Sequence, residues 1–375
     1  MWHNAHAGRI APRAEPYGES PMHIQRSLRL LAQSLLAATL LCGLSAARPA
    51  VAQSGATAAQ QPYHILHTWK LADPGWWDYL HVDSAAHRVY ITRGDHVDVL
   101  NSDSGKLIGT ISGLRGTHGV AFDTAGKYGW VSDGGGNAVV EFDRHTLAKL
   151  ATIPAGTNPD GIIFEPATQT VWAFNGRSHN VTVISAAERK VVATIELPGK
   201  PEFPQVDGRG TVYDNIEDKS EVVRLDAHTL KLTATWPAGC DSPSGLAFDV
   251  PGHRLFPVCE GKKMSVLDSR TGKLLANPAI GDGPDAVRWS AKHKLILVSC
   301  GEGVLSVIDA STPAYKTIQT LPTMRGARTL GYDAATDRIY TVTAEFGPRP
   351  NPTATEPHPR PAMIPGSFTV LVIGR

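Results

Sequence analysis

Hydrophobic and polar positions alternate in four short runs between residues 79 and 111. Residues 88–92 (RVYIT) are rich in β-branched and aromatic side chains, which suit a pleated surface. Residues 97–100 (VDVL) alternate apolar and polar, as a half-buried strand does. Runs at 79–82 and 106–111 complete the set, and turn-forming Asp, Ser and Gly residues separate them. The pattern predicts a four-stranded antiparallel sheet, which needs copies of itself on both sides to bury its faces.

The copies follow at a nearly constant spacing. One residue marks the end of the first strand in each unit: Asp83, Asp123, Glu165, Asp207, Asp249, Ser290 and Asp333. Successive markers lie 40 to 43 residues apart. Four strands at this period are typical of a β-propeller. The seven markers therefore predict an all-β fold with seven blades of four antiparallel strands.

The two ends of the repeat region complement each other. The last unit has its first three strands but reaches Arg375 before a fourth. A surplus strand pattern lies at residues 63–71, ahead of the first unit. We expect this strand to pair beside residues 368–372 and close the last blade, which would leave no free sheet edge.

Several phrases within the repeats are specific enough to compare with known families. They are 76–79 (WWDY), 174–178 (FNGRS), 200–203 (KPEF), 215–218 (NIED), 325–329 (RGART) and 343–348 (TAEFGP). With the strand pattern, they resemble the YVTN-type repeats of the YncE-like bacterial propeller proteins, from residue 64 to the C-terminus. The resemblance implies a secreted or periplasmic seven-bladed propeller. It implies no particular reaction, because a fold does not determine a function.

The first 52 residues have the pattern of a leader. Met22 is followed by Arg26 and Arg29, an apolar run at 30–44, and Ala-Val-Ala at 50–52. These are the parts of a secretory signal peptide, so residues 1–21 are interpreted as a start assigned too early. The sequence thus predicts a leader at 1–52, a single propeller domain at 53–375, and a periplasmic or secreted location.

Two other interpretations of the leader are less favoured. A lipid attached at Cys42 would require small residues before it, whereas Leu40 and Leu41 precede it. The apolar run is also too short for a transmembrane helix. We therefore expect no membrane anchor.

The charge balance argues against a nucleic-acid partner. Of the 36 basic and 35 acidic residues, five arginines and two glutamates lie in residues 1–52, which leaves a net charge of about −2 for the rest. No run rich in Lys or Arg provides the basic footprint of a nucleic-acid groove. We expect no nucleic-acid binding, and a monomer whose partner is a small molecule or a protein at the channel mouth.

Three cysteines follow the leader. Cys240 precedes the first strand of the fifth unit and Cys259 ends the second, so both are expected on one face of antiparallel neighbours. In an export compartment this placement predicts a Cys240–Cys259 disulfide. The alternative is two independent small apolar side chains. Cys300 would be left over, and no nearby histidine favours a metal site among the three thiols.

The candidate site lies where the units differ from one another. Loops entering the first strands of a propeller converge on one mouth of the central channel. The candidate ligand-binding residues there are Trp77, Asp78, His118, Asp160, Glu202, Phe203, Asp285 and Arg328. Aromatic surface with a few polar groups suits a small ligand. The crowded carboxylates also make a divalent cation such as Ca²⁺ a candidate, although the sequence identifies neither a metal site nor a catalytic residue.

A structural interpretation of the same residues stays open. Loops around any channel are polar, and Gly119, Gly161 and Gly245 after the rim positions would permit close packing at the axis. A single histidine is a weak basis for a general base. Gly-x-Ser-x-Gly and dinucleotide-binding motifs are absent from the sequence.

An insertion interrupts the last unit. Residues 347–366 contain seven prolines, where the other units have short connections. Long stiff loops in compact domains are often functional. The insertion could be a lid, a partner contact or neither.

Three classes of function fit these features. We favour an exported, non-enzymatic binding or scaffold protein that uses the channel mouth. The alternatives are a lactonase- or lyase-type propeller enzyme with a divalent metal, and an accessory subunit of a periplasmic redox system. The chain has no Cys-x-x-Cys-His haem motif that would favour a bound haem.

Overall fold

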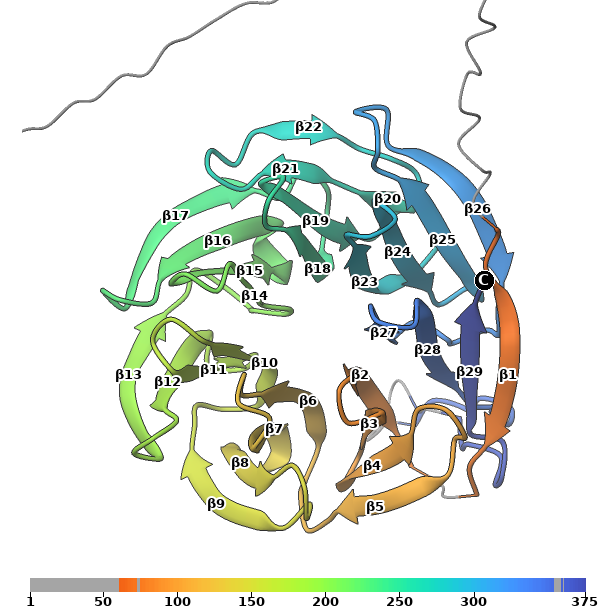
Figure 1. Ribbon diagram of the computed structural model, residues 1–375, viewed down its shortest axis with the longest axis horizontal. Helices are drawn as coiled ribbons and strands as arrows, with labels where there is room; N and C mark the ends of the chain where they lie inside the picture. Colours follow the sequence, from red (N-terminus) through yellow and green to blue (C-terminus); the bar gives the residue numbers. More distant parts are fainter. Residues whose placement is uncertain (1–60, 73–74, 354–358, 360) are drawn as a thin grey trace, which may run out of the picture. The chain divides into compact units, whose positions relative to one another are not determined.

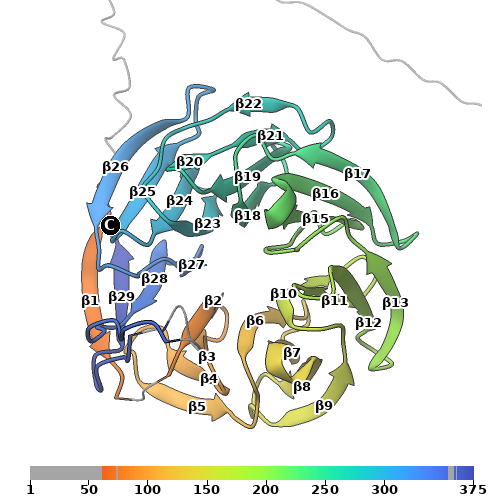
Figure 2. The same cartoon turned by 180° about the vertical axis from the view of Figure 1, so that it is seen from behind.

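Antiparallel β-sheets account for nearly all regular structure in this protein. The computed structural model describes residues 61–72, 75–353, 359 and 361–375. The predicted leader at 1–52 and its cleavage site lie outside the described residues. In the described part, seven sheets stand around a common centre like the blades of a propeller (Figures 1 and 2). The predicted all-β, seven-bladed fold is confirmed.

The strands follow the predicted repeat. The first blade contains β2 (Trp77–Asp83), β3 (Arg88–Arg93), β4 (His96–Asn101) and β5 (Leu107–Ile111), and the second contains β6 (Thr117–Phe122), β7 (Tyr128–Asp133), β8 (Ala138–Asp143) and β9 (Lys149–Pro154). The third contains β10 (Pro159–Glu165), β11 (Thr170–Asn175), β12 (Asn180–Ser185) and β13 (Lys190–Glu196), and the fourth contains β14 (Gln205–Val206), β15 (Thr211–Ile216), β16 (Glu221–Asp226) and β17 (Lys231–Pro237). The fifth contains β18 (Pro243–Asp249), β19 (Arg254–Cys259), β21 (Val266–Asp268) and β22 (Leu274–Ala276), with the extra short strand β20 (Lys263–Met264) beside β19.

The sixth and seventh blades complete the ring. The sixth contains β23 (Pro284–Ser290), β24 (Leu295–Cys300), β25 (Val304–Asp309) and β26 (Lys316–Pro322). The seventh contains β27 (Leu330–Asp333), β28 (Arg338–Thr343) and β29 (Thr369–Gly374), with β1 (His64–Lys70) outside β29. Two single-turn 3₁₀ helices, η1 (Gly134–Gly136) and η2 (Glu217–Lys219), follow second strands.

The strand β1 joins the two ends of the repeat region. It pairs antiparallel with β29, and the sheet order is β1-β29-β28-β27 (Figure 1). Tyr63, directly before it, is buried and donates its hydroxyl to Asp337 at 2.7 Å. The main chain of Tyr63 also exchanges hydrogen bonds with the Gln319 side chain of β26. The N-terminal segment therefore contacts both the sixth and the seventh blade.

The core lies between neighbouring blades. Strand side chains alternate between two faces, so each blade packs apolar residues against the blades on both sides. Trp172 and Phe174 of β11 pack with Val212 and Ile216 of β15, for example. Since each interface needs a blade on either side, closing the ring buries every face.

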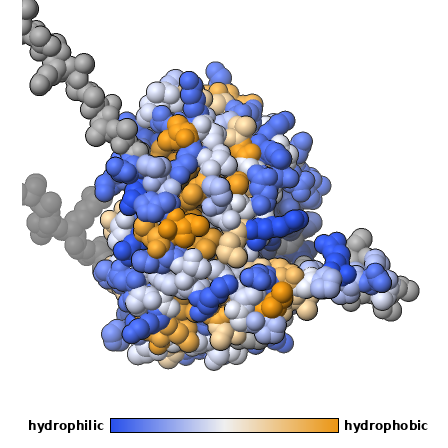
Figure 3. Space-filling view, turned by 90° about the vertical axis from the view of Figure 1, so that its right-hand side faces the viewer, coloured by the Kyte–Doolittle hydropathy of each residue, from blue (hydrophilic) through white to orange (hydrophobic). Residues whose placement is uncertain are grey.

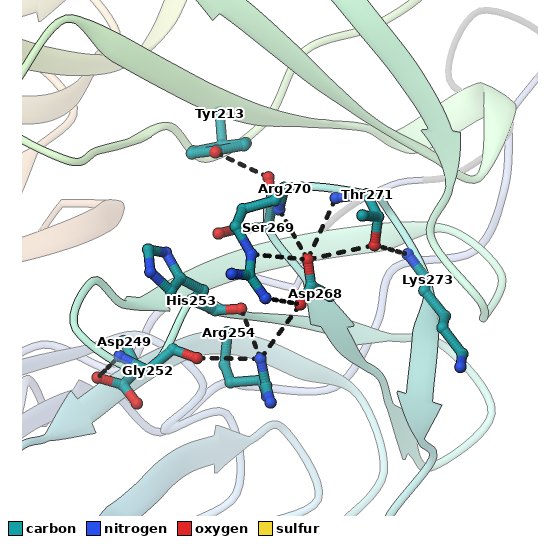
Figure 4. A network of polar contacts seen from close by, with 10 residues as sticks. All are labelled: Tyr213, Asp249, Gly252, His253, Arg254, Asp268, Ser269, Arg270, Thr271 and Lys273. Carbon is teal, nitrogen blue, oxygen red and sulfur yellow. Dashed lines mark hydrogen bonds and ion pairs between the residues drawn. The ribbon is translucent and has the colours of Figure 1, made fainter.

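Aspartates at the ends of third strands hold the turns that follow. At the end of β21, the carboxylate of Asp268 accepts hydrogen bonds from the main-chain N–H groups of Arg270 and Thr271 (Figure 4). The guanidinium of Arg270 also pairs with this carboxylate at 3.0 Å. Asp143 and Asp226 accept equivalent main-chain bonds in the second and fourth blades. These side-chain-to-backbone turns explain why the same residue type recurs at this position.

The cysteines are arranged as expected. Cys240 and Cys259 form a disulfide with a Cα–Cα distance of 5.9 Å, so the predicted bond is confirmed. Among the described residues Cys300 is a free cysteine, and it is buried. Burial raises the pKa of the Cys300 thiol to about 12, so it remains protonated and unreactive at neutral pH.

The outer surface is mixed in character. On the side of the ring that carries β1 and β26, apolar side chains lie in separate patches among polar ones (Figure 3). Ile65 of β1 and Ile318 of β26 are among the exposed apolar residues. Across the described ranges, no helix has the length and apolar character needed to cross a membrane.

Candidate functional site

The candidate residues lie where the innermost strands begin. Asp78 belongs to β2, His118 to β6, Asp160 to β10 and Asp285 to β23, all next to the centre of the ring (Figure 1). Each of these four strands has a shift in pairing register at that residue. Such β-bulges re-aim a side chain away from regular alternation. The bulges therefore set the directions of the four polar side chains at the mouth.

The blade before each rim residue holds its main chain. The hydroxyl of Thr92 of β3 donates a hydrogen bond to the main-chain carbonyl of His118 at 2.8 Å, and the hydroxyl of Ser132 of β7 donates one to the main-chain carbonyl of Asp160 at 2.6 Å. Ser299 of β24 donates to the carbonyl of Arg328 in the same way. These hydroxyl residues hold equivalent places in their second strands. They connect neighbouring blades and fix three of the candidate residues.

Two glycines allow the rim segments to approach each other. A Cβ atom on Gly161 would lie 2.3 Å from the carbonyl oxygen of Glu202, and one on Gly245 would lie 2.4 Å from that of Asp285. No real side chain fits at such distances. The structural interpretation of these two glycines is confirmed, since close packing at the axis requires them.

His118 lies between two carboxylates. Its Nδ1 is 2.7 Å from Asp78 and 3.6 Å from Asp160. Burial lowers the pKa of His118, but the hydrogen bond with Asp78 and the charge of Asp160 outweigh it and raise the pKa to about 9. The imidazole is therefore protonated at neutral pH. Burial and the charge of Asp78 raise the pKa of Asp160, against the attraction of His118.

Lys200 forms a second ionic group. Its ammonium contacts the carboxylates of Glu202 and Glu217. Burial disfavours the charged amine, but the two carboxylates outweigh it and raise the pKa of Lys200. Burial, together with the charge of Asp160, raises the pKa of Glu202 above its usual range. Lys200 is not among the residues predicted for the site; its position two residues before the rim carboxyl residue Glu202 is the sequence signal that could have indicated it.

Arg328 and Asp285 form the third ionic group. Arg328 Nε is 3.1 Å from Asp285 Oδ2, and 61% of the Arg328 side chain is exposed. Burial raises the pKa of Asp285 to about 6, even though Arg328 attracts the ionised form. The guanidinium is therefore much more accessible to a ligand than the Asp285 side chain, which is 15% exposed.

Acidic groups outnumber basic ones at the mouth. The acidic side chains are Asp78, Asp160, Glu202, Glu217 and Asp285, and the basic ones are His118, Lys200 and Arg328. Behind them, Asp214 of β15 is fully buried, and burial raises its pKa well above the usual value. Burial and the neighbouring carboxyl group of Glu202 both disfavour the ionised form of Asp214. A bound cation would favour its ionisation.

Aromatic residues from opposite parts of the ring meet below this layer. Tyr79 follows Asp78 and Phe203 follows Glu202, and their rings contact edge to face with centroids 5.0 Å apart. Phe203 thus joins the candidate site as part of its base. Trp77 does not join the group, because it packs against Phe346 and Phe368 at 6.0 and 5.3 Å.

The proline-rich insertion begins beside the mouth. Phe346 stacks on Trp76 with ring centroids 5.6 Å apart. Trp76 lies two residues before Asp78 in the sequence. Phe346 also pairs with Met363, so the described ends of the insertion lie together. Residues 354–358 and 360 lie outside the described part of the chain.

Three of the mouth residues could hold a metal ion. Asp78, His118 and Asp160 each offer one ligand atom, and these atoms lie within 4.8 Å of one another. Imidazole with carboxylates suits Zn²⁺ or Mn²⁺, whereas Ca²⁺ takes six to eight oxygen ligands. The donor set therefore favours a transition metal over the Ca²⁺ expected from sequence. Because His118 is protonated, a metal would have to displace its proton.

Sequence comparisons give weak but consistent relatives, although no family model matches the chain. The "Uncharacterized protein YncE" of Escherichia coli K12 is 25% identical over 159 residues, which are 39% of this chain and 45% of that protein. The protein of the same name from Salmonella typhi is 24% identical over the same length. The "Protein NirF" of Stutzerimonas stutzeri is 25% identical over 139 residues, 36% of this chain and 35% of that protein. The predicted resemblance is confirmed: the chain is similar in sequence to YncE and NirF, and its fold is a seven-bladed β-propeller.

The matches have a limited reach. This chain spans less than half the length of the curated relatives it matches. A chain of "Kuenenia stuttgartiensis Hydrazine Synthase" superposes with a TM-score of 0.63 at 15% identity, covering 73% of this chain and 94% of that one. "Crystal structure of RRP9 WD40 repeats" superposes with a TM-score of 0.67 at 11% identity, covering 83% and 97%. At such identities the structural matches show the fold alone.

Proposed function

We propose that this propeller is an exported binding protein whose channel mouth holds a small molecule carrying a positive charge. One observation carries the proposal: buried carboxyl groups from separate blades converge on one opening and exceed the basic groups there. Burial raises the pKa values of these carboxyl groups, so they are partly protonated in the unliganded mouth. A ligand cation would favour their ionised forms and be attracted to them.

The base of the mouth supports the same ligand class. Tyr79 and Phe203 each directly follow a carboxyl residue of the mouth, Asp78 and Glu202, and their rings contact each other. An ammonium group is attracted to aromatic rings as well as to carboxylates. Lys200 and Arg328 side chains are partly exposed, so a ligand can displace them.

Export is part of the proposal. The Cys240–Cys259 disulfide fits an oxidising compartment, where such bonds persist. The predicted leader at 1–52, with its signal peptide beginning at Met22, points the same way.

A divalent metal at Asp78, His118 and Asp160 is a second candidate. The observation that favours it is the 4.8 Å clustering of their ligand atoms. The three residues would hold the ion, which would polarise a substrate oxygen in a lactonase- or lyase-type reaction. This site overlaps the mouth, so a cationic ligand and a metal would compete.

A thermal-shift panel at neutral pH separates the candidates. Cadaverine, 1,5-pentanediol and glutarate share a five-carbon chain and differ in charge. We expect cadaverine to raise the melting temperature, and the diol and the dianion to leave it unchanged. Stabilisation by Zn²⁺ or Mn²⁺ that His118→Asn abolishes would favour the metal site. If no amine and no metal stabilises the protein, both candidates are rejected.

A further inference from the structure

The channel continues as a cavity below the mouth. Its volume is about 340 Å³, within the range of roughly 300–1,000 Å³ typical of small-molecule sites. The inner strands of the first, second and third blades supply much of its wall. Apolar side chains that line it include Leu80, Val82, Val120, Phe122, Ile162 and Phe164.

One arginine reaches this apolar space from the opposite side. Arg288 of β23 lines the cavity, with its guanidinium over the Phe203 ring at 4.9 Å from the centroid. Its Nη1 donates to the carbonyl of Val287 at 2.8 Å. The ion pairs of the described residues include no carboxylate for Arg288, and the cavity lining contains none.

The charge of Arg288 is therefore poorly compensated. Burial lowers the pKa of Arg288 to about 10, so the guanidinium is still charged at neutral pH. A guanidinium has five N–H donors, and holding it among apolar groups without an anion costs free energy. Arg288 is half-buried and no ion pair joins it to a carboxylate of the described residues, so an anionic ligand would supply the partner that its guanidinium lacks there.

The neighbouring polar groups do not add a second charge. His81 lines the cavity and packs edge-to-face on Phe122. Desolvation within the protein and the nearby charge of Arg288 lower the pKa of His81, although part of its side chain is exposed, so its ring is neutral at neutral pH and can share hydrogen bonds. Gln205 offers an amide in the same space. One cation, two neutral polar groups and apolar walls match a ligand with a single negative charge.

We propose that the channel below the mouth binds a small carboxylic acid with an apolar body. Arg288 would hold the carboxylate through paired N–H donors, the geometry in which guanidinium and carboxylate fit best. The body would lie against Phe122, Ile162 and Phe164. Tyr79 and Phe203 border both this cavity and the mouth, but the anchoring residue and the sign of the ligand differ, so the site does not depend on the cation-binding proposal.

Isothermal titration calorimetry with octanoate, 1-octanol and octylamine tests the site. The three probes share one apolar chain and differ in charge. We expect the wild type to bind octanoate at least about tenfold more tightly than octanol, since hydrogen bonds to charged groups are the strong ones. Arg288→Gln should lose that advantage, Arg288→Lys should keep part of it, and Arg209→Gln on the exposed turn before β15 should keep all of it.

Several results would overturn the proposal. Equal affinity of the wild type for octanoate and octanol would show that the carboxylate charge of the ligand does not contribute to binding. Full octanoate affinity in Arg288→Gln would show that the arginine is not the anchor. If Arg288→Gln does not fold, Arg288→Lys decides: octanoate affinity equal to that of the wild type would show that the paired N–H donors of the arginine are not the anchor. Failure of octanoate to bind the wild type at millimolar concentration also rejects it.

Discussion

His118 is the residue at which the charge balance of the mouth is set. Its imidazolium lies against Asp78 and near Asp160, and it acts as a cation built into the protein. Any external cation must either join this arrangement or replace the proton on the ring. The protonation state of His118 is therefore both a structural and a functional property.

The stability of the protein should depend on this proton. The pKa of His118 is 6.5 in an unfolded chain and about 9 in the folded protein, so protonated His118 stabilises the fold. That contribution is complete below pH 6.5 and is lost as the pH rises through 9. We expect the free energy of unfolding to fall by at most about 3 kcal/mol across this range. Denaturant unfolding at pH 6, 7.5 and 9 measures it.

Two matched variants show whether His118 causes this pH dependence of stability. His118→Asn should flatten this part of the pH profile, while His145→Asn, on an exposed turn, should leave it unchanged. The buried carboxyls with raised pKa also favour lower pH, so they add to the slope without reversing its sign. A wild-type slope that His118→Asn retains in full would contradict the account.

At this scale, sequence reasoning found some residues and missed others for identifiable reasons. Asp78, His118, Asp160 and Asp285 were predictable because they hold one place in the repeat. The sequence predicts Trp77 at the mouth, whereas the structure packs it against Phe346 and Phe368, because the pairing register shifts at the start of β2 and strand alternation no longer predicts the side-chain direction there. Arg288 lies inside a regular strand, and only the three-dimensional ring shows that it reaches the channel.

At the scale of elements, the repeat made most strands predictable. Successive strands are local in sequence and carry their own turn residues, such as the aspartates that close third strands. The fourth blade departs most from the predicted repeat, because its first strand, β14, has only two residues. Pro201 and Pro204 precede it, and proline has no N–H to donate to a ladder. Such a local exception could be read from the sequence, but the burial of Glu202 beside it could not.

The disulfide should contribute measurably to the fifth blade. It closes a loop with a sequence separation of 19 residues. Loop-closure entropy for a ring of about 20 residues corresponds to about 3 kcal/mol. Cys240→Ser with Cys259→Ser should lower the free energy of unfolding by about that amount. Dithiothreitol should destabilise the wild type and not the double variant, and equal sensitivity of the two would contradict the assignment.

The N-terminal strand should be required for a stable ring. Deleting residues 63–71 would expose the edge of β29 and remove the contacts of Tyr63 with Asp337 and Gln319. Free edges promote aggregation. We expect an insoluble or strongly destabilised protein, and partial rescue by a synthetic peptide of residues 62–71. A soluble truncated protein with an unchanged melting temperature would show that β1 is dispensable.

For the whole molecule, the fold could be predicted well and the ligand could not. Seven similar units dictate a ring whatever the ring binds. The ligand depends on pKa values and on contacts between distant blades, such as Tyr79 with Phe203. These properties arise only when the ring is closed.

Export can be tested on the mature protein. We expect N-terminal sequencing of periplasmic or secreted material to begin at Gln53, after the Ala-Val-Ala sequence at 50–52. Replacing Ala52 with a bulky residue should leave an uncut precursor. A lipidated N-terminus at Cys42, or a full-length protein in the cytoplasm, would contradict the predicted leader.

The central claim is that the carboxylates at the mouth bind a cation, and one comparison tests it most directly. Asp160→Asn with Asp285→Asn removes two acidic groups whose pKa values burial raises, so the unliganded melting temperature should change little. Cadaverine should raise the melting temperature of the wild type and leave that of the double variant unchanged. If the double variant loses 1 kcal/mol or more of unliganded stability, or keeps the cadaverine effect, the ring of carboxylates is structural and the claim is wrong.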